Sequence, residues 1–229
     1  MPGMTKNQKE TIHQAEQLAH NAQNNPEMAA EMANYGYSEE RWNEGEALIE
    51  AAKAAAANNK LAYSAKLGTT DAFIQSYDHT WEQCRELADI CTNLFKTKTE
   101  HLAALGLHKQ RSQTTGQSRL TRPRKTCSFA EFQAWSRNLY HVALTHPDIT
   151  PVLNNYGYPT DRLTQEATDV EATIQANHVQ EQAKETALQS TVDRDHAFAR
   201  LNIWYRRAQK FAAKAEKRLK KRPTIEVSL

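Results

Sequence analysis

Glycine and proline are scarce in this chain, with seven of each among 229 residues. Valine is also uncommon, and no stretch alternates apolar and polar residues for long, so a β-sheet has little from which to form. The long stretches between the few breaks are rich in Ala, Gln, Glu, Lys and Leu, which are strong helix formers. We therefore predict an all-α protein.

The sequence has no run of about 18 apolar residues, which excludes a membrane-spanning helix. Residues 1–24 lack the apolar centre of a signal peptide. The cysteines Cys84, Cys91 and Cys127 are odd in number and form no Cys-x-x-Cys motif. Without an export signal they are expected to be reduced thiols, so we expect a cytoplasmic protein.

Motifs of common cofactor sites are missing as well. There is no Gly-rich phosphate loop, and no zinc-finger, homeodomain or RNA-recognition signature. A di-iron site in a helical bundle needs two Glu-x-x-His pairs. Glu10 and His13 form one, but the corresponding residues in the second copy of the repeat described below are Glu131 and Ala134. We therefore expect no metal, no cofactor and no catalytic residue.

Charge is balanced overall, at +2, but is distributed unevenly. The segment 108–125 holds six Lys or Arg and no acid, and the segment 199–222 holds ten Lys or Arg and one acid. The rest of the chain has 13 basic and 26 acidic residues, a formal charge of −13. Such segregation points to anionic partners for the two basic segments.

One internal repeat is present, at an offset of 121 residues. The tetrapeptide Asn-Tyr-Gly-Tyr at 34–37 recurs at 155–158, and 13 of 49 positions are identical between 5–53 and 126–174. His20 and His141 are also related by this offset. The clustering of identities around a rare aromatic tetrapeptide favours an internal duplication.

Each copy carries the same helix punctuation. A first helix is expected at about 5–24 and again at about 128–146, followed by a short helix that ends at the tetrapeptide glycine. A second helix should start at Ser38 or Pro159. A third should start after Gly68 and near Ser190 or Thr191.

The third helices carry the clearest apolar stripes, at spacings of three and four residues. In the first copy the stripe comprises Phe73, Tyr77, Trp81, Cys84, Ala88, Cys91 and Phe95. In the second copy it comprises Phe198, Leu201, Tyr205, Ala208, Ala212, Ala215 and Leu219. Such narrow seams are typical of helices in antiparallel bundles.

These patterns divide the chain into repeat 1 (1–106), a basic flexible linker (107–126), repeat 2 (127–222) and a C-terminal tail (223–229). The repeats could form two separate three-helix domains or one antiparallel helical bundle with pseudo-twofold symmetry. Narrow apolar seams bury little area alone, so we favour one body.

Two sets of residues are candidates for binding. The first set is a pocket at the repeat interface, lined by Tyr35, Tyr37, Tyr156, Tyr158, His20 and His141. The competing interpretation is that each tetrapeptide joins two helices and that its Tyr rings fill the joint. The second set consists of basic residues that attract phosphates: Arg119, Arg122, Arg124, Lys125, Arg206, Arg207, Lys210 and Lys214. Intramolecular acids are the alternative partners of these cations.

The leading functional hypothesis is a non-enzymatic helical-bundle protein for protein–protein interaction, self-association or assembly. It rests on long helices, a duplicated plan and segregated charge. The first alternative is sequence-independent nucleic-acid binding through the basic linker and the basic C-terminal helix. The second alternative is a small-ligand site at the repeat interface.

Overall fold

The computed structural model describes residues 4–111, 118–120 and 122–221. These residues form seven helices and two three-residue strands. Their order is α1 (Lys6–Asn24), α2 (Pro26–Ala33), α3 (Glu39–Leu94), α4 (Thr99–Ala104), β1 (Lys109–Arg111), β2 (Ser118–Leu120), α5 (Phe129–Thr145), α6 (Thr150–Asn155) and α7 (Thr160–Leu219). The predicted all-helical character is confirmed, and the only strands in the described part of the chain form one short ladder.

The helix starts follow from local capping chemistry. Thr5 and Gln8 form a capping box at the start of α1, and Ser128 and Glu131 form one at the start of α5. The Asn25 side chain accepts hydrogen bonds from the first turn of α2, in which Pro26 takes the first position. These contacts satisfy backbone N–H groups that have no partner inside the helix.

The tetrapeptide glycines end helices α2 and α6, as predicted. Gly36 and Gly157 have φ angles of 82° and 87°, which are favourable only for glycine. The N–H of Tyr37 donates to the carbonyl of Met32 at 3.1 Å, as in a Schellman motif. In the second copy the residues 121 positions later, Tyr158 and Leu153, form the same bond at 3.1 Å.

Helices α3 and α7 are continuous, and the expected separation into second and third helices is wrong. α3 has 56 residues and passes through Gly68, while α7 has 60 residues and passes through Ser190. Gly68 keeps a negative φ, and open space surrounds the position of a Cβ atom there. One glycine costs a helix only about 1 kcal/mol, which the helix formers on either side offset.

The helices form two compact units. Unit 1 comprises Met1–Lys66 and Ala183–Leu229, and unit 2 comprises Leu67–Gln182. Each unit therefore contains one part of α3 and one part of α7. The units divide the chain differently from the sequence repeat, because their boundaries fall inside the two long helices.

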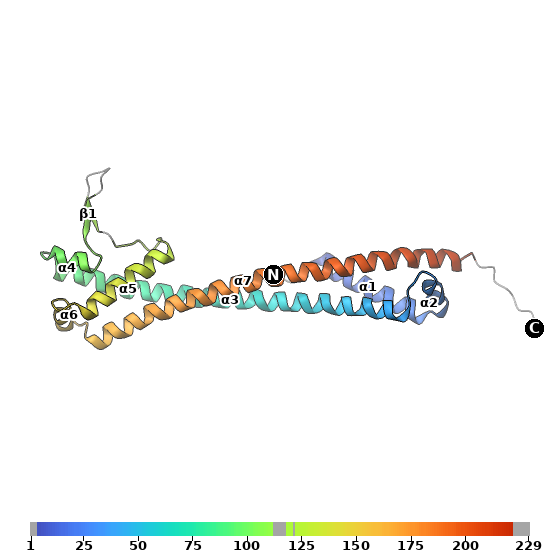
Figure 1. The fold of residues 1–229 in the computed structure, drawn as a ribbon, viewed down its shortest axis with the longest axis horizontal. Coiled ribbons are helices and arrows are strands. Elements are labelled where there is room, and N and C mark those ends of the chain that lie inside the picture. The colour runs from blue at the N-terminus through green and yellow to red at the C-terminus, as the bar shows by residue number, and fades with distance from the viewer. Residues whose placement is uncertain (1–3, 112–117, 121, 222–229) are drawn as a thin grey trace, which may run out of the picture. The chain divides into compact units, whose positions relative to one another are not determined.

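In unit 1, α1 and α2 pack against the first part of α3 and the last part of α7, which lie side by side (Figure 1). Contacts join Trp42 to Trp204 and Asn59 to Ser190, so the two long helices run antiparallel here. In the core, alanines of α1, α3 and α7 pack around larger apolar side chains. The buried residues include Ala15, Ala19, Met32, Tyr37, Trp42, Ile49, Leu201, Trp204, Ala208 and Ala215.

The indole of Trp204 packs directly against the backbone at Gly45. A Cβ atom at Gly45 would lie 2.0 Å from the indole ring. The ring also contacts Trp42 edge-on, with ring centroids 5.9 Å apart, and its N–H donates to the Arg41 carbonyl at 3.2 Å. Gly45 is therefore the residue that allows α7 to approach α3 at this level.

In unit 2, α5 and α6 pack against the second part of α3 and the first part of α7. The core is larger and more aromatic than that of unit 1, and Tyr140, Tyr158, Phe95 and Phe132 are among its largest fully buried side chains. The predicted third-helix stripe of repeat 1 is buried here from Trp81 to Phe95. Cys84 and Cys91 belong to it as buried thiols, not as disulfide partners.

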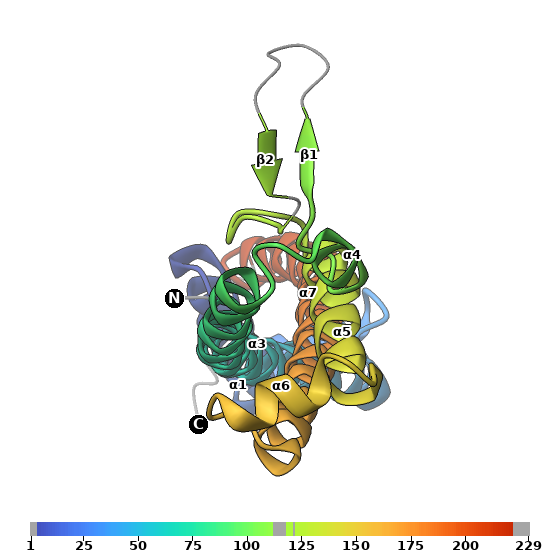
Figure 2. The ribbon, with the colours of Figure 1, turned by 90° about the vertical axis from the view of Figure 1, so that its left-hand side faces the viewer.

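Two short strands interrupt the predicted linker. β1 and β2 are antiparallel, with Lys109 opposite Leu120 and Arg111 opposite Ser118 (Figure 2). The sequence pattern does not predict them because three-residue strands are too short to show alternation. Residues 112–117 and 121 of the linker and the predicted tail at 223–229 lie outside the described residues.

The Gly45–Trp204 contact gives a direct test of the fold of unit 1. Gly45→Ala should lower the free energy of unfolding by about 1–3 kcal/mol, because the added methyl group overlaps the indole. The control Gly68→Ala, in open space on the same helix, should raise it by about 0.5–1 kcal/mol. Urea denaturation followed by circular dichroism measures both. Two variants of equal stability would contradict the packing described.

Candidate anion-binding surface

The end of α7 separates apolar and basic residues onto opposite faces. Leu201, Trp204, Ala208, Ala212 and Ala215 are buried in the core of unit 1. Helical periodicity then turns the opposite face of α7 to solvent. That face carries a row of exposed cations at spacings of three and four residues, named here the basic stripe: Arg207, Lys210, Lys214 and Lys217.

The basic stripe has no carboxylate partner among the residues that the structure describes. Arg206, beside the stripe, is likewise exposed and without an ion pair in that part of the chain. The Lys214 ammonium lies 5.4 Å from the centre of the Phe211 ring, a weak cation–π contact. Neighbouring Arg218 differs, because its guanidinium lies 3.7 Å from the Glu31 carboxylate and 5.0 Å from the Tyr35 ring centre.

The linker cations are placed differently. Arg122 forms an ion pair with Asp89, and Lys125 lies 2.8 Å from Asp78, so acids of α3 neutralise both. Arg124 is exposed, and the side chain of Arg119 lies outside the described residues. Among the residues whose side chains the structure describes, the α7 segment therefore has more cations without an acid partner than the linker segment.

The candidate tyrosines and histidines divide between the two units. Unit 1 contains Tyr35, Tyr37 and His20, and unit 2 contains the second set: Tyr156, Tyr158 and His141. Tyr37 and Tyr158, the second tyrosines of the two tetrapeptides, are buried. Tyr156, the first tyrosine of the second tetrapeptide, is 61% exposed. Both histidines are exposed, and His20 contacts the Asn24 amide of its own helix. A pocket that both sets share stays a prediction.

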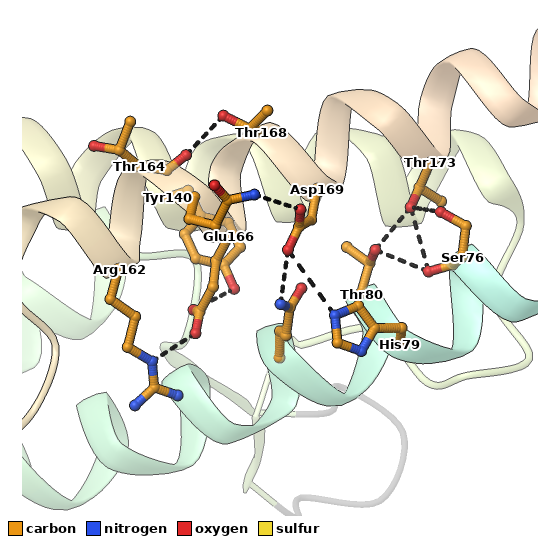
Figure 3. Close-up of polar contacts among 12 residues, drawn as sticks. Ser76, His79, Thr80, Tyr140, Arg162, Thr164, Glu166, Thr168, Asp169 and Thr173 are labelled. Carbon is orange, nitrogen blue, oxygen red and sulfur yellow. Dashed lines mark hydrogen bonds and ion pairs between the residues drawn. The ribbon is translucent and has the colours of Figure 1, made fainter.

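Unit 2 contains a buried ionic cluster that sequence patterns do not reveal. The Tyr140 hydroxyl donates to the Glu166 carboxylate at 3.0 Å, and Arg162 donates to the other oxygen at 2.7 Å (Figure 3). Arg162 also contacts Glu86 at 3.3 Å and lies 3.9 Å above the Tyr158 ring. Each carboxylate oxygen of Glu166 thus has a donor, which offsets the cost of burying the charge.

The environment of this cluster keeps its phenols protonated. Burial raises the pKa of Tyr140, and the neighbouring Cys84 thiol and Glu166 carboxylate raise it further. Burial also raises the pKa of Tyr158, whose hydroxyl lies near Glu86. The Tyr140 phenol thereby acts as a hydrogen-bond donor to Glu166 in the core.

A second polar group lies further along the same helices. The Thr173 hydroxyl of α7 lies 2.7 Å from that of Thr80 and 2.6 Å from that of Ser76, and Asp169 accepts from the Gln83 amide at 2.9 Å (Figure 3). Hydrogen bonds between these side chains hold each turn of α7 opposite a particular turn of α3. Register between α3 and α7 in unit 2 is thereby fixed by hydrogen bonds.

Neither a cluster of metal-ligating side chains nor a membrane-spanning helix occurs among the residues that the structure describes. They contain no group of three or more His, Cys, Asp or Glu side chains arranged to hold a metal ion. None of their helices is long and apolar enough to cross a membrane.

Comparisons with protein-family models, curated proteins and solved structures find no match. Function therefore has to be inferred from the chemistry of the surfaces.

The buried thiols give a prediction about pH. Burial raises the pKa of Cys84 and Cys91 to about 12, whereas an unfolded thiol titrates near ~8.5. Below ~8.5 this contribution to stability is fully present, and it is lost as pH rises because only the unfolded thiols ionise.

Above pH ~9.5, where the unfolded thiols are almost fully ionised, each thiol should lower the free energy of unfolding by about 1.4 kcal/mol per pH unit, and by less nearer pH ~8.5. Cys84→Ala/Cys91→Ala should have a shallower slope than wild type in urea denaturation, whatever its stability at neutral pH. Equal slopes would mean that the two thiols are not buried as described.

Proposed function

We propose that the protein is a non-enzymatic cytoplasmic binding protein whose basic stripe contacts the phosphate backbone of nucleic acid. The observation that carries the proposal is the row of exposed cations without acid partners among the described residues. From Arg207 to Lys217 the row spans about 15 Å of helix, at 1.5 Å per residue. It is long enough to meet several successive phosphates.

The burial of the apolar face of α7 favours nucleic acid over a membrane surface. An amphipathic helix binds lipid by inserting its apolar face between headgroups. In α7 that face, which includes Leu201, Trp204 and Ala208, is occupied by the core of unit 1. Only the polar face of α7 is available for a partner, and its cations can contact a phosphate backbone.

Recognition of this type is independent of base sequence. Lys and Arg contacts to phosphates supply affinity and position but carry no sequence information. The formal charge of −13 outside the two basic segments repels a polyanion from the rest of the chain.

The number of cations involved is measurable from salt dependence. Lys210→Gln/Lys214→Gln/Lys217→Gln should bind a short DNA duplex more weakly in fluorescence anisotropy. The slope of log affinity against log salt should become shallower by about 0.9 for each lysine–phosphate pair removed, or about 2.7 in total.

The matched control removes three exposed lysines elsewhere, as Lys9→Gln/Lys60→Gln/Lys98→Gln, with the same change in net charge. It should keep the wild-type slope. An equal loss of affinity in both variants would show that DNA binding depends on net charge alone, and would contradict binding at the basic stripe. Absence of binding by the wild type at low salt would end the proposal.

Self-association is the second candidate function, and it continues the interaction hypothesis from sequence. Leu61 of α3 and Leu188 of α7 are 69% and 70% exposed, which is unusual for leucine. Both belong to unit 1, and the nearby Asn59–Ser190 hydrogen bond places them at the same level of the antiparallel pair. These two exposed leucines are the proposed points of contact with a second copy.

Leu61→Glu/Leu188→Glu tests this surface. The variant should be monomeric in sedimentation velocity at concentrations where the wild type forms dimers, because two buried charges oppose contact. Ile203→Glu, at a residue 55% exposed in the same unit, is the control and should leave the dimer intact. A wild type that stays monomeric at every concentration would rule out this second function.

We further propose that the two copies arose by duplication. Support comes from the repeated order of elements, in which a long, a short and a very long helix follow one another twice. α3 and α7 start at Glu39 and Thr160, which are 121 residues apart, as are Gly36 and Gly157 with their similar φ angles. A pseudo-twofold bundle formed by both copies remains a prediction.

A further inference from the structure

The offset of 121 residues relates two surfaces, each within one unit. In unit 2, Arg162 lies over the Tyr158 ring and is neutralised by Glu166 and Glu86, at 2.7 and 3.3 Å. Nearby, His79 faces Asp169 at 3.9 Å. This surface therefore carries its own counterions.

In unit 1 the corresponding arginine lacks these counterions. Arg41 occupies the position of Arg162, and its guanidinium lies 5.6 Å from the Tyr37 ring centre. The residues that correspond to Glu166 and Glu86 are Gly45 and Arg207. One acid is thus replaced by a glycine and the other by a second arginine.

The same exchange occurs at the neighbouring pair. The residues that correspond to His79 and Asp169 are Arg200 and Leu48, so a third arginine replaces the histidine and a leucine replaces its acid. The glycine itself is required by the Trp204 indole, because a Cβ atom at Gly45 would lie 2.0 Å from that ring. Packing and charge at this site therefore changed together.

The three arginines of unit 1 line one hollow of about 190 Å³. Buried Tyr37, Leu48 and Trp204 contribute to its wall, and Arg41, Arg200 and Arg207 contribute three guanidinium groups. Glu44 is its one acid, which leaves a formal charge of +2. Among the described residues no carboxylate forms an ion pair with the three arginines.

We infer that this hollow, the arginine pocket, binds a phosphate group. A phosphate or phosphomonoester carries about −1.5 to −2 charges at neutral pH, which matches the charge of the pocket. Planar guanidinium groups donate two parallel hydrogen bonds to its oxygens. Arg41 and Arg207 lower the pKa of Tyr37, but burial outweighs them, so its phenol stays protonated as a further donor.

The ligand is either free phosphate or the phosphate end of a larger ester. Isothermal titration with inorganic phosphate and with adenosine monophosphate distinguishes these sources, with sodium chloride at equal ionic strength as the blank. Equal affinities indicate that the phosphate alone is recognised. Tighter binding of the nucleotide indicates that its nucleoside also contacts the pocket. Binding of neither probe overturns the inference.

Variants locate the site and separate it from the basic stripe. Arg41→Gln/Arg200→Gln changes two exposed side chains outside the stripe and should weaken phosphate binding at least tenfold. Lys210→Gln/Lys214→Gln/Lys217→Gln should bind phosphate within twofold of wild type. Circular dichroism melts check that both variants fold. Unchanged phosphate affinity in Arg41→Gln/Arg200→Gln would overturn the assignment.

The inference does not rest on nucleic-acid binding. Binding of phosphate without binding of DNA would support the arginine pocket and contradict the proposed function. Binding of DNA without binding of phosphate would contradict the pocket and support the proposed function.

Discussion

The contact of the Trp204 indole with the backbone at Gly45 determines how the end of α7 lies in unit 1. With the indole seated there and its N–H bonded to the Arg41 carbonyl, the small residues that follow on α7 face the core. A helix with its apolar face fixed inward has its opposite face fixed outward. The direction of the basic stripe is therefore a consequence of core packing.

The two units solve the same packing problem in chemically different ways. At the level of Arg162, unit 2 buries Glu166 and surrounds it with Tyr140 and Arg162. Unit 1 has an indole and a glycine at the corresponding level and leaves Arg41 without a carboxylate among the described residues. A buried carboxylate needs partners on every side, whereas an indole needs only space and one acceptor. The charge of Arg41 therefore stays without a partner carboxylate among the described residues, whereas Arg162 pairs with two carboxylates.

Local features of the fold can be predicted from the sequence because they depend on neighbours in the chain. The helix ends at Gly36 and Gly157 follow from glycine's tolerance of positive φ. The stripe from Trp81 to Phe95 is buried as its spacing predicts. Other features are beyond such patterns. Gly68 does not end a helix, because its effect depends on the helix formers around it, and the strands β1 and β2 are too short for any pattern.

The candidate site is partly predictable for the same reason. Composition identifies the basic end of α7 but cannot tell which cations have acid partners, since Arg122 and Lys125 meet acids of α3 that lie far away in sequence. Arg41 gives no signal because it is an isolated cation in its segment, and Arg200 is counted in the basic segment 199–222 without any sign that it lies near Arg41. The signal that could have found the pocket is the loss of an acid at Gly45 of repeat 1 and at Arg207 of repeat 2, since the corresponding residue of the other copy is in each case a glutamate.

Contact with nucleic acid through one face of α7 can be mapped residue by residue from the chemical shifts of the isotope-labelled chain with a short DNA duplex. We expect perturbed amides at 206–218 and at the neighbouring turn of α3 around Arg41, with little change in residues 67–182. Perturbations centred on the linker cations Arg122 to Lys125, or none at a saturating duplex concentration, would contradict it.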